Sequence, residues 1–173
     1  MLWVDKHRPH SLDKFTLANA DTASHLKRLV ADGDCPHLLF YGVSGAGKKT
    51  LALAVLREIF GPAVEKVKVE GKTWKLEQGD RKIEVELTTL SSNYHVEMNP
   101  SDVGTKDRYV VQEVIKDMAK SRPIDATGKQ GFKVLILNEV DKLSKEAQHG
   151  LRRTMEKYSQ ACRLILICNS VSK

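Results

Sequence analysis

Apolar residues recur along this chain at two spacings, and each spacing predicts a type of element. Spacings of three and four residues predict helices over residues 20–33, 50–60, 101–120 and 144–160. Short continuous apolar runs predict strands over 37–42, 94–99, 134–137 and 163–169, and those at 37–42, 134–137 and 163–169 are expected to be buried. The opening segment 3–9 is predicted to be extended, because Pro9 pushes the preceding residue out of the helical region.

The predicted helices have apolar faces and recognisable ends. The first helix is expected to end at Gly33, and the last to begin after Ser144, whose hydroxyl suits an N-cap. The first helix has its apolar face at Ala23, Leu26, Leu29 and Val30, the third at Val110, Val111, Val114, Ile115 and Met118, and the last at Ala147, Leu151, Met155 and Tyr158. We expect these faces to pack against a sheet.

Between residues 64 and 89 the pattern changes to alternation of apolar and polar residues. Alternation predicts strands, and Gly79-Asp80 suits the turn between them, so we expect a twisted β-hairpin inserted into the domain. Residues 121–131 are predicted to form a polar loop. Elsewhere strands alternate with helices, which predicts an α/β domain whose parallel sheet is covered by helices on both faces.

Composition fits one domain over residues 1–173. The chain has 28 Lys and Arg against 22 Asp and Glu, a net charge of +6, which is compatible with a polyanionic partner, although the basic residues are spread along the sequence. The three cysteines lack the spacing of a zinc site or a disulfide framework and are expected to be reduced. No apolar run is long enough to span a membrane and no signal peptide is recognisable, so we expect a soluble protein with no membrane partner.

The stretch YGVSGAGKKT (41–50) is close to the phosphate-binding pattern G-x-x-x-x-G-K-[ST], and it lies between a predicted strand and a predicted helix. Glycines at 42, 45 and 47 allow successive backbone N–H groups to turn toward phosphate oxygens. Lys48 would reach the terminal phosphates, and the helix would direct its positive end to the same place. The alternative is a plain strand-to-helix turn.

The last position of the pattern is altered, because Lys49 stands where a hydroxyl usually holds magnesium. Thr50 does not replace that hydroxyl, since one residue along a helix turns the side chain by about 100°. Lys49 would also place positive charge near the spot that the cation should occupy. The magnesium ligand of the motif is therefore missing.

Two later strand ends carry further candidates. In ILNEVDKL, Asn138 occupies the place of the acidic residue that organises magnesium, while Glu139 keeps that of the base that activates water. In RLILICNS, Asn169 could orient the attacking water or contact the γ-phosphate. Glu139 and Asp141 could instead be ordinary charges at a strand end, and Asn169 an ordinary strand terminator. With Lys49, Asn138 predicts a nucleotide-holding site with impaired hydrolysis and no metal residue of its own.

The segments WVDKHRP, GVSGAGKKT, LNEVDKL, GLRRTMEKYS and LILICNS occur in this order, and together they resemble the small subunits of the replication factor C clamp loader, within the AAA+ ATPases. The resemblance covers essentially all 173 residues. Among these small subunits, the chain resembles the one whose own ATP site is degenerate, because it has the lysine pair, Asn138 and the hairpin insertion. The resemblance implies a P-loop AAA+ domain in the nucleus, which acts with other replication factor C subunits. These use ATP to load a sliding clamp onto primer–template DNA.

The resemblance also implies roles for particular residues. Glu139 would be the remnant of the catalytic base and Asn169 a sensor, and ATP or ADP would be bound with weak or no Mg²⁺. Arg152 and Arg153 would contact a neighbouring subunit's nucleotide or DNA phosphates, or would simply form a solvated basic face. His7 replaces a tyrosine of the family. Residues Val4, Arg8 and Pro9 would lie at the adenine, and Gly42, Gly45, Ala46, Gly47, Lys48, Lys49 and Thr50 along the phosphates.

Beyond the position of Lys173 the family continues with an arginine that completes the neighbouring active site, a helical lid and an assembly collar. We expect these parts to be absent here, which implies a truncated sequence or a product that cannot assemble in the family's manner. Two other function classes stay open. One is a competent ATPase or nucleotide kinase that recruits metal ligands elsewhere, and the other is an interaction module with an empty site.

Overall fold

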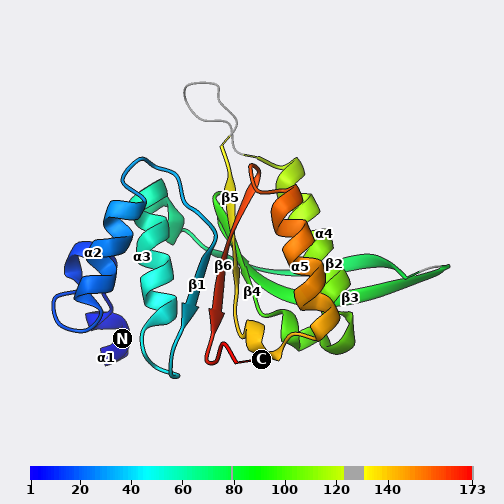
Figure 1. The fold of residues 1–173 in the computed structure, drawn as a ribbon, viewed down its shortest axis with the longest axis horizontal. Helices are drawn as coiled ribbons and strands as arrows, with labels where there is room; N and C mark the ends of the chain where they lie inside the picture. Colours follow the sequence, from blue (N-terminus) through cyan, green and yellow to red (C-terminus); the bar gives the residue numbers. More distant parts are fainter. Residues whose placement is uncertain (79, 123–130, 173) are drawn as a thin grey trace.

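The computed structural model describes residues 1–78, 80–122 and 131–172. Within them, six strands form one sheet in the order β1-β6-β5-β4-β3-β2 (Figure 1). The strands are β1 (Leu38–Tyr41), β2 (Lys68–Gln78), β3 (Arg81–Ser91), β4 (His95–Met98), β5 (Lys133–Leu137) and β6 (Cys162–Cys168). The helices are α1 (Trp3–His7), α2 (Ala20–Leu29), α3 (Lys48–Phe60), α4 (Asp107–Lys120) and α5 (Lys145–Lys157).

The sheet confirms the predicted α/β fold and shows that it is mixed. Strands β1, β6, β5 and β4 pair in parallel, whereas β3 pairs antiparallel with β4 and β2. The antiparallel pair β2–β3 is the predicted hairpin, and its register brings Gln78 opposite Arg81. Of the predicted turn, Gly79 lies outside the described residues, as does most of the predicted loop at 121–131.

Helices cover both faces of the sheet, with α2 and α3 on one face and α4 and α5 on the other (Figure 1). The alternating sides of β5 explain why VLIL is continuously apolar, since Val134 and Ile136 pack with α3 while Leu135 and Leu137 pack with α4 and α5. The five predicted apolar positions of α4 are all buried.

Edge position corrects the prediction for β1, which was expected to be fully buried. Leu38 and Phe40 pack against the α2–α3 side, but Leu39 is 50% and Tyr41 66% exposed. The cause is that β1 lies at the edge of the sheet, where its other face is left partly uncovered.

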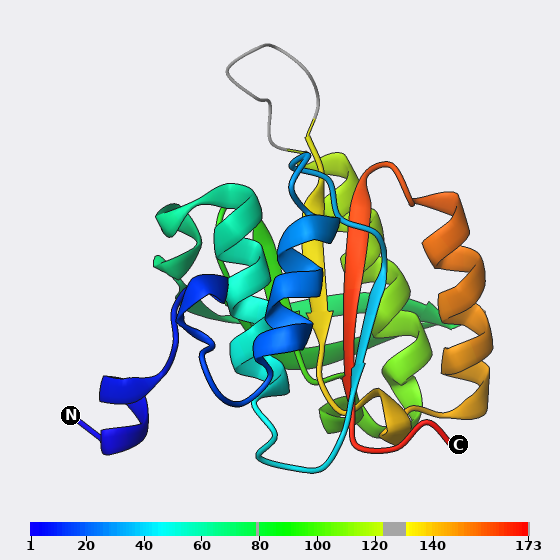
Figure 2. The same cartoon turned by 60° about the vertical axis from the view of Figure 1, so that its left-hand side comes forward.

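The N-terminal segment also differs from its prediction. Residues 3–7 form the short helix α1, not an extended segment, with Asp5 and Lys6 N–H groups donating to the Leu2 carbonyl. Proline restricts only its neighbour, and Arg8 is indeed extended with φ −63° and ψ 124°. Helix α1 projects from the body of the domain (Figure 2) and buries no residue.

Several element boundaries move. Helix α2 ends at Leu29 and not at Gly33. The Leu29 side chain is 42% exposed, because it lies about 100° around the helix axis from the buried Val30. Residues 62–65 form a 3-10 turn, so the hairpin begins only at Lys68. Another 3-10 segment, Pro100–Lys106, precedes α4, because Gly104 has φ +62° and interrupts the helical path.

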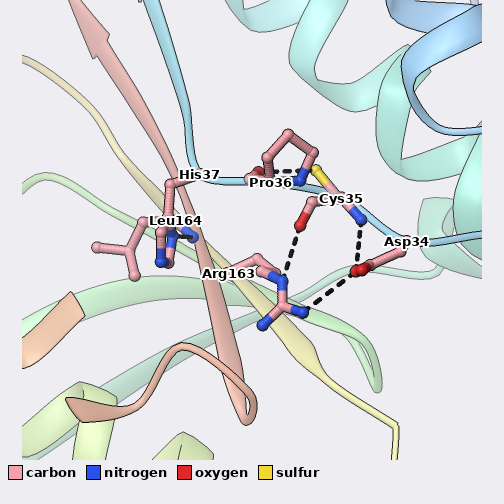
Figure 3. A network of polar contacts seen from close by, with 6 residues as sticks. All are labelled: Asp34, Cys35, Pro36, His37, Arg163 and Leu164. Atoms are coloured by element: carbon pink, nitrogen blue, oxygen red, sulfur yellow. Dashed lines mark hydrogen bonds and ion pairs between the residues drawn. The ribbon is translucent and has the colours of Figure 1, made fainter. Parts of the chain in front are cut away.

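Arg163 of β6 holds the loop that leads into β1 (Figure 3). Its guanidinium donates to the Cys35 carbonyl at 2.7 Å and to the Asp34 carboxylate at 3.2 Å. In the same network the Leu164 N–H donates to His37 Nδ1 at 3.0 Å. These contacts set the position from which β1 runs toward the glycine-rich loop.

Candidate nucleotide-binding site

Residues from four separate segments meet around an open cavity of about 450 Å³ at the carboxyl end of the parallel strands. Because parallel strands end at the same edge, residues distant in sequence converge there. Most of the predicted site residues line this cavity, namely Val4, Arg8, Gly45, Ala46, Gly47, Lys48, Lys49, Thr50, Asn138, Glu139 and Asn169. Ser44, Ile167 and Cys168 complete the lining.

The glycine-rich loop has the backbone that its sequence requires. Gly42, Gly45 and Gly47 have φ values of +152°, +82° and +85°, which side-chain-bearing residues rarely adopt. Helix α3 begins directly after Gly47, so its N-terminus faces the cavity. Asn19, which sequence reasoning missed, donates to the Ala46 carbonyl at 3.0 Å and holds the loop from outside.

The Lys48 ammonium lies at the centre of this loop. It donates to the Gly42 and Val43 carbonyls at 2.7 Å each and to Asn169 Oδ1 at 3.0 Å. These partners match the three donors of an ammonium, so an entering phosphate would exchange with one or more of them. Gly42 thus contributes its carbonyl here although it does not line the cavity.

Lys49 has a different partner, Glu97 of β4. The Lys49 ammonium lies 2.6 Å from Glu97 Oε1, and the Asn138 amide donates to the same oxygen at 2.8 Å. Glu97 is only 5% exposed. Sequence reasoning missed it, because a glutamate within a short strand carries no motif and only the pairing of β4 with β5 brings it here.

Glu139 lines the cavity in a left-handed conformation with φ +54°. Lys142 donates to its carboxylate at 2.8 Å and Asn99 at 3.3 Å. These contacts, that of Lys142 first, lower the pKa of Glu139 below its usual value. A carboxylate with a lowered pKa has less affinity for a proton and is a weaker general base. Asn99 and Lys142 were not identified from the sequence.

The hydroxyl that follows the lysine pair is turned toward the N-terminal segment. Arg8 donates to Thr50 Oγ1 at 3.4 Å, and its other nitrogen lies 3.6 Å from Asp5. Pro9 does not line the main cavity. It lies in an adjoining one of about 260 Å³ that shares Arg8 and Thr50.

Arg152 and Arg153 lie elsewhere, both exposed on α5. Arg152 lines a cavity of about 430 Å³ beside Leu39 and Val171. Arg153 lines another of about 390 Å³ beside Arg108 and His149. The structure therefore places neither arginine at this chain's own site.

The described part of the chain, residues 1–78, 80–122 and 131–172, holds no cluster of three or more His, Cys, Asp or Glu residues suited to a metal ion. It also holds no helix with the length and apolar character needed to cross a membrane.

Comparisons with known proteins agree with this geometry. The chain is 68% identical to replication factor C subunit 5 of Oryza sativa subsp. japonica over 173 residues, and 66% identical to subunit 3 of Arabidopsis thaliana. It is 52% identical to human subunit 3 over 172 residues. All or 99% of this chain is covered in these matches, but it spans only about half of each relative, 47–49%.

Solved structures support the fold. Two RuvB variants of Thermotoga maritima match with TM-scores of 0.53 and 0.51 at 18% and 20% identity. Each match covers 94% of this chain and 42% of the other chain. Residues 38–173 match the ATPase family associated with various cellular activities (AAA). With a glycine-rich loop, a parallel sheet and strand-end polar residues around one cavity, the chain belongs to the AAA family.

Proposed function

We propose that this chain acts in a clamp loader of the replication factor C type, with other replication factor C subunits, a sliding clamp and primer–template DNA. The complex would use ATP to load the clamp during DNA replication and repair, which places it in the nucleus. The observation that carries this proposal is the 52–68% identity to replication factor C subunits 3 and 5 over nearly the whole chain. The net charge of +6 is compatible with a DNA partner.

Within that complex, this chain binds ATP or ADP with little or no hydrolysis. The glycine-rich loop and Lys48 receive the phosphates, and Asn169 acts as a sensor through its contact with Lys48. Val4 and Arg8 take the adenine end, on the side of the cavity formed by the N-terminal segment, and Pro9 lies next to them in the adjoining cavity.

Impaired hydrolysis is supported by three residues that line the cavity, Lys49, Asn138 and Glu139. Lys49 and Asn138 supply neither a hydroxyl nor a carboxylate for Mg²⁺. Glu139, the base remnant, is held by Lys142 and Asn99 and has a lowered pKa. Mg²⁺ is therefore bound weakly or not at all, and the chain works through its neighbours.

Hydrolysis by the isolated full-length protein tests the degenerate site. With ATP and Mg²⁺ we expect almost no turnover, measured as phosphate release. Robust hydrolysis that Lys48→Ala abolishes would contradict the proposal and favour a competent ATPase.

Nucleotide binding separates the proposal from an interaction module with an empty site. Calorimetric titration with ADP is expected to give a Kd tighter than about 10 μM, equivalent to about 7 kcal/mol. Failure to bind ADP would favour the module. Native mass and the identity of any co-purified nucleotide then test assembly and occupancy together.

Contact with a neighbour or with DNA is assigned to Arg152 and Arg153, which are exposed on α5. Arginines of this kind bind the phosphate backbone of DNA through electrostatic attraction. The chain should therefore bind duplex DNA weakly, and its affinity for DNA should fall steeply as the salt concentration rises. Binding that is insensitive to salt would argue against this assignment.

A further inference from the structure

Two residues that occupy magnesium-ligand positions of the nucleotide site converge on one buried carboxylate. Lys49 is the second residue of α3, and Asn138 directly follows β5. Both reach Glu97 Oε1 of β4, at 2.6 Å from the ammonium and 2.8 Å from the amide. In P-loop NTPases these positions carry a hydroxyl and an acidic residue that hold Mg²⁺.

The residues present do not fit a divalent cation. Mg²⁺ prefers oxygen ligands with negative charge, yet Lys49 supplies a positive charge and Asn138 a neutral amide that uses its N–H₂ group on Glu97. An aspartate at position 138 would put two carboxylates in contact, which requires a cation or a shared proton between them. Asparagine removes that need, because it donates a hydrogen bond to Glu97.

The burial of the Glu97 carboxylate explains why the Lys49 ammonium stays beside it. Glu97 is 5% exposed, and a buried carboxylate is unfavourable unless it is paired and hydrogen-bonded. Lys49 supplies the pairing charge while its own side chain stays 45% exposed. An ammonium has three donors, so Lys49 can hold Glu97 and still donate to a phosphate oxygen in the cavity that it lines.

We propose that the Lys49 ammonium, anchored by Glu97 and Asn138, is the fixed cation of this site, so that ADP and ATP bind without a divalent metal. Glu97 does not line the cavity, and it acts as a positioning residue through Lys49. This inference rests on the proposed nucleotide binding and adds what replaces the metal there.

The ratio of ADP affinities in EDTA and in excess Mg²⁺ tests the inference on the full chain. We expect the two Kd values to agree within about threefold, well below the tenfold that corresponds to about 1.4 kcal/mol. A tenfold or larger weakening in EDTA overturns the inference but leaves nucleotide binding standing. No binding in either buffer overturns the proposed function itself.

Lys49→Thr restores the usual residue type and removes the ammonium. In EDTA its affinity for ADP should fall at least tenfold, and added Mg²⁺ should recover part of that loss, because Glu97 is then free to attract the metal. Lys82→Thr removes the same charge from an exposed position of the hairpin and should change neither value. Equal EDTA affinities for Lys49→Thr and the unmodified chain would refute the role of Lys49.

Glu97→Gln distinguishes an anchor from a metal ligand. If Glu97 bound Mg²⁺, this variant would lose affinity in Mg²⁺ and not in EDTA. We expect instead that the ratio of the two affinities stays near one, since the ammonium remains and only its anchor is neutralised. Thermal unfolding of each variant shows whether the fold is retained. A loss of ADP affinity that occurs in Mg²⁺ but not in EDTA would contradict the proposal.

Discussion

At the scale of single residues, the site is governed by two adjacent lysines with different partners. Lys48 points into the loop, where two carbonyls and Asn169 hold it, whereas Lys49 points across to Glu97 on another strand. The separation follows from the helix, which turns consecutive side chains by about 100°. The two charges therefore serve different purposes, and their substitutions should have different effects.

Lys48→Ala should weaken ADP binding about 10- to 100-fold, since a hydrogen bond to a charged group contributes about 1.5–3 kcal/mol. The loss should be of similar size in EDTA and in Mg²⁺, because the proposed partner of Lys48 is phosphate and not metal. Calorimetry provides the measurement. Lys145→Ala, on an exposed position at the start of α5, is the matched control, and a Lys48→Ala affinity equal to that of this control would contradict the assignment.

The double variant Lys49→Thr/Asn138→Asp should acquire Mg²⁺-dependent nucleotide binding. It restores a hydroxyl at position 49 and a carboxylate at position 138, where the Asn138 amide nitrogen now lies 2.8 Å from Glu97 Oε1. Two carboxylates in contact call for a cation between them. Affinity for ADP should rise at least tenfold, about 1.4 kcal/mol, when Mg²⁺ replaces EDTA. An unchanged ratio would show that these two positions do not control the metal.

At the scale of elements, the starts of α4 and α5 are joined by one buried carboxylate. Asp107, at the first position of α4, accepts from the Ser144 backbone N–H at 2.8 Å and from its hydroxyl at 3.0 Å. Ser144 in turn caps α5 by accepting from the Ala147 N–H at 3.1 Å. The cap was predicted from the sequence, whereas its partner Asp107 was not, because it lies 37 residues away.

Ser144→Ala should lower the free energy of unfolding by about 1–2 kcal/mol, because the N-cap bond is lost and Asp107 loses a donor. Urea titration followed by circular dichroism measures the change. Ser24→Ala on the exposed side of α2 makes the same chemical change without a cap and should stay within about 0.5 kcal/mol. A loss no larger than that of Ser24→Ala would show that the cap contributes little.

At the scale of the whole molecule, the sheet separates two sets of helices, and the residues of the site meet at the carboxyl ends of its parallel strands. Two histidines, the half-buried His37 before β1 and the buried His95 of β4, lie within this sheet framework. His37 accepts from the Leu164 N–H at 3.0 Å, and His95 is 1% exposed on β4. Burial lowers the pKa of both imidazoles from the usual 6.5, and Arg163 lowers that of His37 further.

Because these pKa values are lowered in the folded state, the unfolded chain binds more protons as pH falls. Their contribution to stability is therefore complete above about pH 6.5 and is lost as pH falls through the folded pKa values. We expect the free energy of unfolding to decrease as the pH falls below about 6.5, measured by urea titration at a series of pH values. The decrease should be smaller in His37→Gln, but not in His25→Gln, which changes an exposed position of α2. If the free energy of unfolding falls with pH by the same amount in the unmodified chain and in both variants, His37 is excluded as a cause of the pH dependence.

The sequence by itself determined the features that depend on neighbours along the chain. Helical spacing located α3, α4 and α5, and the glycine pattern placed Lys48 at a phosphate-binding turn, because both depend on local backbone geometry. It also indicated α/β architecture, since strands and helices alternate. Its error at β1 arose because exposure at the edge of the sheet depends on strand order, and its error at α1 arose because Pro9 restricts only Arg8 and leaves residues 3–7 free to form a helix.

Only the tertiary structure decided what the altered loop is paired with. Strand order places β4 next to β5, and that pairing brings Glu97 to Asn138 from 41 residues away and into reach of Lys49. In the same way, Asn99 reaches Glu139 across 40 residues. A residue's type and local pattern do not encode its neighbour on an adjacent strand, because that neighbour is fixed by the packing of the sheet. The sequence thus identified two positions, 49 and 138, that lack the usual residue types of a magnesium site, and the fold identified Glu97 as the carboxylate that pairs with Lys49.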